Sequence, residues 1–137
     1  MVGYPHDVKS MILDNEAILH HMKKGAYLID HTTSSPDLAV EIYNEAKKLG
    51  IHSIDAPVSG GDIGAKTGTV VTMVGAEEED FENVEDLMKH YSKTIELMGG
   101  PGAGQHTKAA NQIMIANNMI GVCEALVYAK NNNINLE

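Results

Sequence analysis

The chain has 137 residues, which is close to the size of one ordinary domain and excludes two complete domains. Hydrophobic residues make up 43% and charged residues 21%, a composition typical of folded globular proteins that excludes wholesale disorder. Ten lysine and arginine residues against 19 aspartate and glutamate residues give a formal net charge of −9, so we expect no nucleic-acid-binding surface.

The predicted elements alternate between helix and strand along the chain. A turn at residues 3–5 leads into short helical material from residue 7 to about residue 24, and the apolar run at residues 26–30 predicts a buried strand. Residues 36–49 form a predicted helix with Ser35 as N-cap, Pro36 in the first turn and Gly50 as the stop.

The second half continues the alternation. We expect strands at residues 51–56, 70–74 and 93–98, a glycine-punctuated segment at 57–69, a helix at 77–90, a turn at 99–102 and a long helix from 103 to about 132. The helix at 77–90 should bury Phe81, Val84, Leu87 and Met88.

Strands that alternate with helices predict an α/β fold with a doubly wound parallel sheet, because parallel neighbours need crossover helices. The last helix, at 1.5 Å per residue, is ~45 Å long. Because a crossover needs less, we expect this helix to leave the first domain.

Cysteine and histidine usage also narrows the possibilities. Cys123 is the only cysteine, which excludes a disulfide scaffold and favours a reducing cytoplasm. We expect Cys123 to be buried, and the methionines to fill gaps in or near the core: Met11, Met22, Met88, Met114 and Met119. The histidines lack a metal-ligand spacing, so no metal site is expected.

No apolar run approaches the ~18 residues of a membrane span, so no membrane association is expected.

The strongest candidate segment is residues 55–69, which contains the turn Ser59-Gly60-Gly61. A hydroxyl followed by two glycines places a side-chain donor beside backbone N–H groups with no Cβ in the way, and such a turn can receive a carboxylate or another anion. A flexible surface loop that needs glycine for its turn geometry explains the same residues equally well.

The second candidate segment is residues 102–112, where Lys108, Asn111 and Gln112 project from one face of the predicted helix. A lysine near apolar surface can have a pKa low enough for general acid or base work, while amides orient a substrate hydroxyl. Spacing alone favours a solvated lysine with capping amides. His106 is expected to be a surface or capping imidazole.

The third candidate segment is residues 30–36, between a predicted strand and a predicted helix. In open α/β sheets ligands bind beyond the carboxyl ends of strands, so these hydroxyls suit a ribose or an amide. Capping of the helix explains Ser34 or Ser35, whereas it explains Thr33 less well.

In order and spacing the three segments resemble the β-hydroxyacid dehydrogenase family, which includes 3-hydroxyisobutyrate dehydrogenase, 2-hydroxy-3-oxopropionate reductase and, more distantly, 6-phosphogluconate dehydrogenase. Residues 55–69 are similar to its D-A-P-V-S-G-G motif with a following G-A-x-x-G-T. Residues 102–112 are similar to its G-x-G-x-x-x-K helix start, and residues 28–36 to its I-D-x-[ST]-T-x-x-P stretch. The resemblance covers essentially the whole chain.

The resemblance implies roles for individual residues. It assigns the general acid/base to Lys108 and binding of the substrate carboxylate to Ser59, Gly60 and Gly61. Thr33 would contact the cofactor, and the turn with Tyr4 and Pro5 resembles a loop that approaches the cofactor. Many members carry Asn four residues after the lysine, where this chain has Gln112 preceded by Asn111, so either amide is a candidate for substrate contact.

The resemblance also implies a domain plan and an activity. Residues 1–102 would be the C-terminal half of a Rossmann-like nicotinamide-dinucleotide-binding domain without its G-x-G-x-x-G fingerprint, and residues 103–137 an interdomain helix that begins an all-helical domain. The intact enzyme would transfer a hydride between NAD or NADP and a small 3-hydroxy acid or its semialdehyde. This chain alone should be inactive and should bind the cofactor weakly or not at all.

Three further expectations stay open at this stage. A half-sheet has an unpaired strand edge and an exposed apolar helix face, so we expect a homo-oligomer or a longer parent chain of which this sequence is a part. A non-catalytic binding or oligomerisation module that keeps the fold is the main alternative to an enzyme. A phosphate-sugar binder ranks last, because no basic cluster lies beside the glycine turns.

Overall fold

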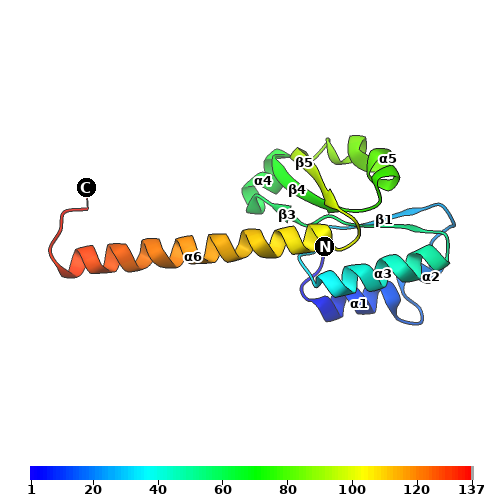
Figure 1. Ribbon diagram of the computed structural model, residues 1–137, viewed down its shortest axis with the longest axis horizontal. Helices are drawn as coiled ribbons and strands as arrows, with labels where there is room; N and C mark the ends of the chain where they lie inside the picture. Colours follow the sequence, from blue (N-terminus) through cyan, green and yellow to red (C-terminus); the bar gives the residue numbers. More distant parts are fainter. Residues whose placement is uncertain (137) are drawn as a thin grey trace.

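The computed structural model describes residues 1–136, and its central feature is a five-stranded sheet with helices on both faces (Figure 1). The strands are β1 (Tyr27–Asp30), β2 (His52–Asp55), β3 (Val58–Ser59), β4 (Val70–Gly75) and β5 (Ser92–Gly99). The helices are α1 (Pro5–Leu13), α2 (Ile18–His21), α3 (Pro36–Lys48), α4 (Gly61–Thr67), α5 (Glu78–Met88) and α6 (Ala103–Asn131).

The predicted α/β fold class is confirmed, and the sheet adds an antiparallel ladder that the sequence did not predict. The pairs β1–β2 and β4–β5 are parallel and are joined by the crossover helices α3 and α5. Strand β4 runs antiparallel to both β2 and β3, with Asp55 opposite Gly75 and Ser59 opposite Val71. The reason is that β3 extends the line of β2 and the short α4 then reverses the chain. Residues 57–69 therefore contain a strand and a helix where only a glycine-punctuated segment was expected.

Two apolar clusters hold the helices to the sheet, one on each face. The first joins α1, α2 and α3 to Leu28 of β1. The second joins α5 to β2, β4 and β5 through Ile54, Val74, Val84 and Met88. Because side chains alternate across a strand, neighbouring residues such as Leu28 and Ile29 serve opposite clusters.

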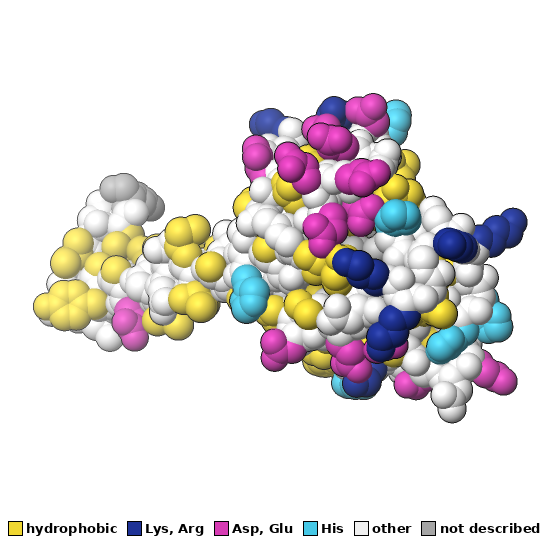
Figure 2. All heavy atoms as spheres, turned by 45° about the vertical axis from the view of Figure 1, so that its right-hand side comes forward, with side chains coloured by type: hydrophobic (Ala, Val, Ile, Leu, Met, Phe, Trp, Pro, Cys, Tyr) yellow, Lys and Arg dark blue, Asp and Glu magenta, His cyan; other side chains and the backbone are white. Residues whose placement is uncertain are grey.

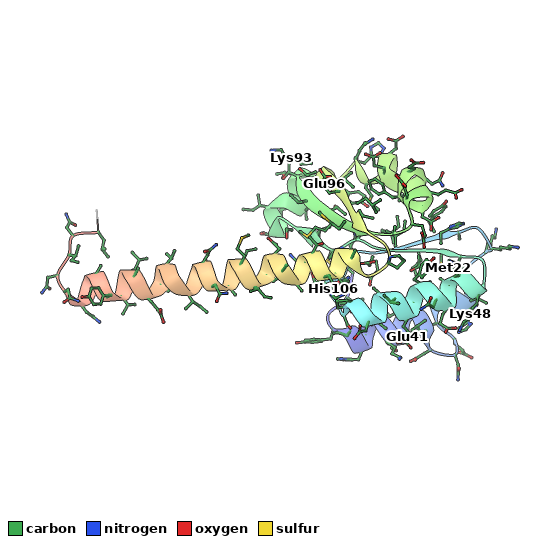
Figure 3. The ribbon with its side chains drawn as sticks, viewed as in Figure 1. Met22, Glu41, Lys48, Lys93, Glu96 and His106 are labelled. Atoms are coloured by element: carbon green, nitrogen blue, oxygen red, sulfur yellow. The ribbon has the colours of Figure 1, made fainter. Side chains whose placement is uncertain are left out.

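Local signals explain where the crossover helices lie. Ser35 Oγ accepts the backbone N–H of Leu38 at 3.4 Å and Pro36 occupies the first turn, so the predicted start of α3 is confirmed. The outer side of α3 carries Glu41 and Lys48, and Glu41 pairs with Lys9 of α1 (Figure 3). In α5 the prediction for Leu87 is wrong, because Leu87 is 57% exposed and the buried stripe is instead Asp80, Val84 and Met88.

Helix α6 leaves the body after its first turns and projects into solvent (Figure 1). Cys123 is exposed, so the prediction that it is buried is wrong. Met114 and Met119 of α6 and Met11 of α1 are also exposed, so the predictions for these three are wrong. Met88 is fully buried and Met22 packs against the first cluster, as expected. Residues 103–131 bury few side chains because no other described element lies along most of this helix.

The same helix corrects the expectation about membrane spans. By length and composition alone, α6 is long and apolar enough to cross a bilayer, although none of the relevant window is buried inside the molecule. Figure 2 shows apolar side chains distributed over the projecting part of α6, whereas acidic side chains gather over the α5 side of the body.

Candidate active site

The three candidate segments meet at one cleft of about 470 Å³. Thr33 follows β1, Ser59 ends β3 and leads into Gly60 and Gly61, and Lys108 and Gln112 come from α6. Residues 33, 59 and 108, which are far apart in the sequence, therefore line the same cleft. Thr33 is exposed in this cleft, so its hydroxyl is available to a ligand.

Lys108 and Asn111 converge on the hydroxyl of Ser59. Lys108 Nζ donates to Ser59 Oγ at 2.8 Å, and Asn111 Nδ2 donates to the same oxygen at 3.0 Å. Lys108 is only 8% exposed, and burial lowers the pKa of its ammonium below the ordinary value. The alternative of a solvated lysine is therefore wrong. A buried lysine that already holds a hydroxyl is chemically suited to exchange a proton with a second hydroxyl.

The Ser-Gly-Gly turn has a backbone that side chains would strain. Gly60 has φ +138° and Gly61 has φ +60°, and both lie exposed at the cleft just before and within the start of α4. A Cβ on Gly60 would come within 3.3 Å of Val70 Cα. The turn is thus fixed between β3 and α4 against β4, which argues against the alternative of a flexible loop.

The start of α6 is fixed by two side chains that sequence reasoning did not assign. The Asp55 carboxylate accepts the backbone N–H groups of Gly102 at 2.6 Å and Gln105 at 2.9 Å. Gln105 Nε2 donates to Thr32 O at 2.6 Å, and its Oε1 accepts the backbone N–H of Ser34 at 2.8 Å. Burial raises the pKa of Asp55, and the two backbone N–H bonds oppose that rise. The available signal was an acid at the end of a buried strand together with a helix that begins at glycine.

The remaining predicted residues do not all reach the cleft. Tyr4 is 67% exposed and stacks on His6, and Pro5 is the first residue of α1. Neither Tyr4 nor Pro5 lines the cleft. Met1 lines it instead. His106 is exposed, as predicted, and projects from α6 on the side away from β4 and β5 (Figure 3).

Among residues 1–136 no three His, Cys, Asp or Glu side chains gather as ligands for a metal ion. A second cavity of about 460 Å³ lies near the starts of β2 and α5, where His52 Nδ1 and Asp80 Oδ1 are 2.5 Å apart. Lys93 and Glu96 lie on β5, which pairs with β4, in the part of the body away from α3 (Figure 3).

Comparison with known proteins assigns the family. Residues 1–100 match the family model of the NAD binding domain of 6-phosphogluconate dehydrogenase, and residues 102–137 match that of the NAD-binding region of NADP-dependent 3-hydroxyisobutyrate dehydrogenase. The chain belongs to the β-hydroxyacid dehydrogenase family. This confirms the resemblance seen in the sequence.

Named relatives agree with this assignment. The chain is 48% identical to an uncharacterized oxidoreductase of Bacillus subtilis over all 137 residues, which are 48% of that protein. It is 44% identical to 2-hydroxy-3-oxopropionate reductase of Escherichia coli, covering 94% of this chain and 44% of that protein. The structure of 3-hydroxyisobutyrate dehydrogenase of Mycobacterium tuberculosis with L-serine superposes with a TM-score of 0.91 at 29% identity, covering 99% of this chain and 46% of that one. The chain thus spans about half the length of the relatives it matches.

Proposed function

We propose that this chain supplies the substrate end of the active site of an NAD- or NADP-dependent oxidoreductase that acts on a small 3-hydroxy acid or its semialdehyde. The observation that carries the proposal is the 2.8 Å hydrogen bond between Lys108 Nζ and Ser59 Oγ inside a cleft. It joins the proposed acid/base group to the proposed carboxylate-binding turn. The family assignment supports the same reaction class.

Lys108 serves as the general acid/base in this proposal. In oxidation its neutral amine takes the proton from the substrate hydroxyl, and in reduction its ammonium returns a proton to the forming hydroxyl. Burial of the ammonium lowers its pKa, which makes the neutral form accessible nearer to neutral pH than in a free lysine.

The turn Ser59-Gly60-Gly61 holds the substrate by its carboxylate, and one of the two amides, Asn111 or Gln112, orients the hydroxyl end. The Ser59 hydroxyl already accepts two donors, from Lys108 and Asn111, so its own hydrogen is free to point at a carboxylate oxygen. Of the two amides, Asn111 is the one that contacts the turn, whereas Gln112 lines the open cleft. We therefore assign substrate contact first to Gln112. The contribution of these residues to rate is positioning.

The cofactor end is represented by fewer residues. A bound nicotinamide supplies the hydride acceptor or donor. Thr33 fits it, because its exposed hydroxyl follows a strand end and faces the same cleft as Lys108. Tyr4 and Pro5 remain candidates for cofactor contact by family likeness alone. The sequence contains no G-x-G-x-x-G unit for the pyrophosphate, so we expect this chain by itself to bind NAD or NADP weakly or not at all.

A chimera tests the proposal. The chain replaces the matching segment of the E. coli 2-hydroxy-3-oxopropionate reductase, and nicotinamide absorbance reports turnover. Lys108→Ala should lower kcat by roughly 10²-fold to 10⁴-fold, because proton transfer loses its positioned group. Lys66→Ala, at an exposed lysine on α4, is the matched control and should leave kcat unchanged. An active chimera whose Lys108→Ala variant keeps near-normal turnover contradicts the proposal.

Domain plan, assembly and location remain predictions of the proposal. Residues 103–137 would begin a helical domain, and a second copy would cover the exposed apolar side chains of α6. A cytoplasmic location follows from the cysteine usage, although some relatives from Arabidopsis thaliana and Mus musculus carry mitochondrial in their names.

A further inference from the structure

We propose that Asp55 is a positioning residue of this site: its carboxylate fixes the start of α6 at the depth at which Lys108 reaches Ser59. The inference rests on the proposed function only in giving Lys108 its chemical importance. Its geometric content stands on the contacts of Asp55, Gly102, Gln105 and Ser59.

Helix α6 has no capping side chain of its own. Its N-cap is Gly102, with φ +89°, and no side chain adjacent in sequence accepts its first N–H groups. Asp55, 47 residues earlier, accepts two of them at 2.6 and 2.9 Å. A carboxylate at a helix N-terminus makes charge-assisted hydrogen bonds and interacts favourably with the helix dipole. The cap is therefore tertiary, and it ties α6 directly to the end of β2.

The surroundings of Asp55 leave room for this arrangement and for little else. Asp55 is 6% exposed. A Cβ on Gly75 would collide with Asp55 Oδ1, and a Cβ on Gly104 would collide with Met73 O and meet Asp55 O at 2.8 Å. Two glycines thus allow the helix start to approach the sheet closely enough for the carboxylate to reach both N–H groups. This close approach also fixes how deep α6 lies.

Asp55, which caps α6, and Ser59, which accepts the Lys108 hydrogen bond, are both held by pairing with the same strand. Asp55 and Ser59 both pair with β4, opposite Gly75 and Val71. Lys108 lies six residues after Gly102, which is roughly 9 Å along the helix axis at 1.5 Å per residue. Any displacement of the helix start is therefore passed to Lys108 almost undiminished, while Ser59 stays in place. Displacements of about 1 Å are enough to impair catalysis by 10²-fold in other enzymes.

The second contact of α6 has a different effect. Gln105 bonds to Thr32 and Ser34 from a 2% exposed position, and these bonds fix the rotation of the helix against the loop that carries Thr33. Asp55 fixes the depth at the helix start. Together they orient Lys108 and Thr33 toward the same cleft.

The test measures the titration of Lys108 in the 137-residue chain by ¹³C NMR of labelled lysine side chains, with the signal assigned from Lys108→Arg. In Asp55→Asn one amide oxygen replaces two acceptors, so the helix start should loosen and Lys108 should move toward solvent. The midpoint of Lys108 should then rise by about 0.5 pH units or more toward that of the exposed lysines. A purely electrostatic role of Asp55 predicts the opposite sign, because loss of a negative charge weakens proton binding by lysine.

Two further variants make the result decisive. Asp62→Asn removes an equal charge from the exposed rim near Gly61 without touching α6, and it should leave the Lys108 midpoint unchanged or slightly lower. Asp55→Ser keeps one acceptor on a shorter side chain. If Asp55→Asn does not fold, the Lys108 midpoint is measured in Asp55→Ser instead, and the same rise is expected. A Lys108 midpoint that is unchanged or lower in a folded Asp55 variant overturns the proposal.

This outcome is separable from that of the proposed function. The chimera with Lys108→Ala tests whether the lysine carries the reaction, whereas the titration tests only what holds the lysine. If turnover survives Lys108→Ala while the midpoint still rises in Asp55→Asn, the positioning stands and the assigned chemistry fails.

Discussion

The two ends of α6 have the same secondary structure and opposite surroundings. In the first three turns Gly104, Gln105 and Lys108 are buried against the sheet, and a polar network fixes them. Farther along, apolar residues such as Ile113, Ile120 and Val127 are more than half exposed. In one helix, then, polar residues are inside and apolar residues are outside. Neighbouring elements, and not residue type, decide burial at each position.

The largest expected effect contrasts two glycines of this helix. Gly104→Ala should destabilise the chain by about 3 kcal/mol, because the new Cβ collides with Met73 O and crowds Asp55. Gly121→Ala meets nothing within 4 Å and should stabilise the helix by about 0.5–1 kcal/mol, because alanine is the better helix former. Urea unfolding followed by circular dichroism measures both. Equal effects would show that the two ends are not different in packing.

A smaller effect concerns the buried charge of Lys108. Burial lowers the pKa of Lys108 in the folded chain below its value in the unfolded chain. The charged ammonium therefore reduces the free energy of unfolding, and this reduction is fully present at pH values below the folded pKa. Lys108→Met should raise the free energy of unfolding at pH 7 by about 1 kcal/mol. The advantage should shrink as pH rises through the folded pKa toward 10.5, where the wild-type lysine folds uncharged. Thermal unfolding from pH 6 to 10.5 checks this, and a constant difference would contradict it.

A still smaller effect is expected at Ser34, beside Gln105. The Ser34 backbone N–H is bonded to Gln105, whereas its hydroxyl is buried without a hydrogen-bond partner among the described residues. Ser34→Ala should therefore stabilise the chain by about 0.5 kcal/mol. Ser35→Ala is the matched control, since it removes the N-cap of α3 and should destabilise by about 1 kcal/mol. The same unfolding assay should give these two opposite signs.

The smallest effect on stability is expected at the projecting end. Ile120→Glu with Val127→Glu should change the free energy of unfolding by no more than about 0.5 kcal/mol, because both side chains are exposed in the single chain. The same change should lower self-association in sedimentation velocity, since charges replace apolar surface. A large loss of stability without any change in mass would mean that this end is not an association surface.

Much of the element order was predictable because its signals are local. Ser35 and Pro36 define the start of α3 through a cap and a first-turn proline, and the glycines at 99, 100 and 102 separate β5 from α6. The antiparallel orientation of β4 was not predictable. It depends on the short helix α4, which reverses the chain direction within a glycine-rich segment that carries no clear helical or strand pattern. Leu87 was misplaced because helical spacing gives a stripe but not which of two adjacent stripes faces the sheet.

The candidate site divides in the same manner. Residue types and spacing singled out Lys108, Ser59, Gly60 and Gly61 as candidates but left a solvated lysine and a flexible loop open, and the family resemblance implied their roles. Spacing did not reveal Asp55 or Gln105, whose partners lie between 47 and 73 residues away. Side chains that act through long-range contacts carry no local pattern.

The sequence by itself determined most of the order of elements, the family resemblance and the candidate motifs, because periodicity, capping residues and motif spacing are properties of short stretches of chain. Only the tertiary structure decided that Lys108 is buried and faces Ser59, that Asp55 caps a helix 47 residues away, and that Cys123 lies in solvent. Burial and long-range hydrogen bonds depend on which elements come to lie side by side, and that is settled by packing of the whole chain.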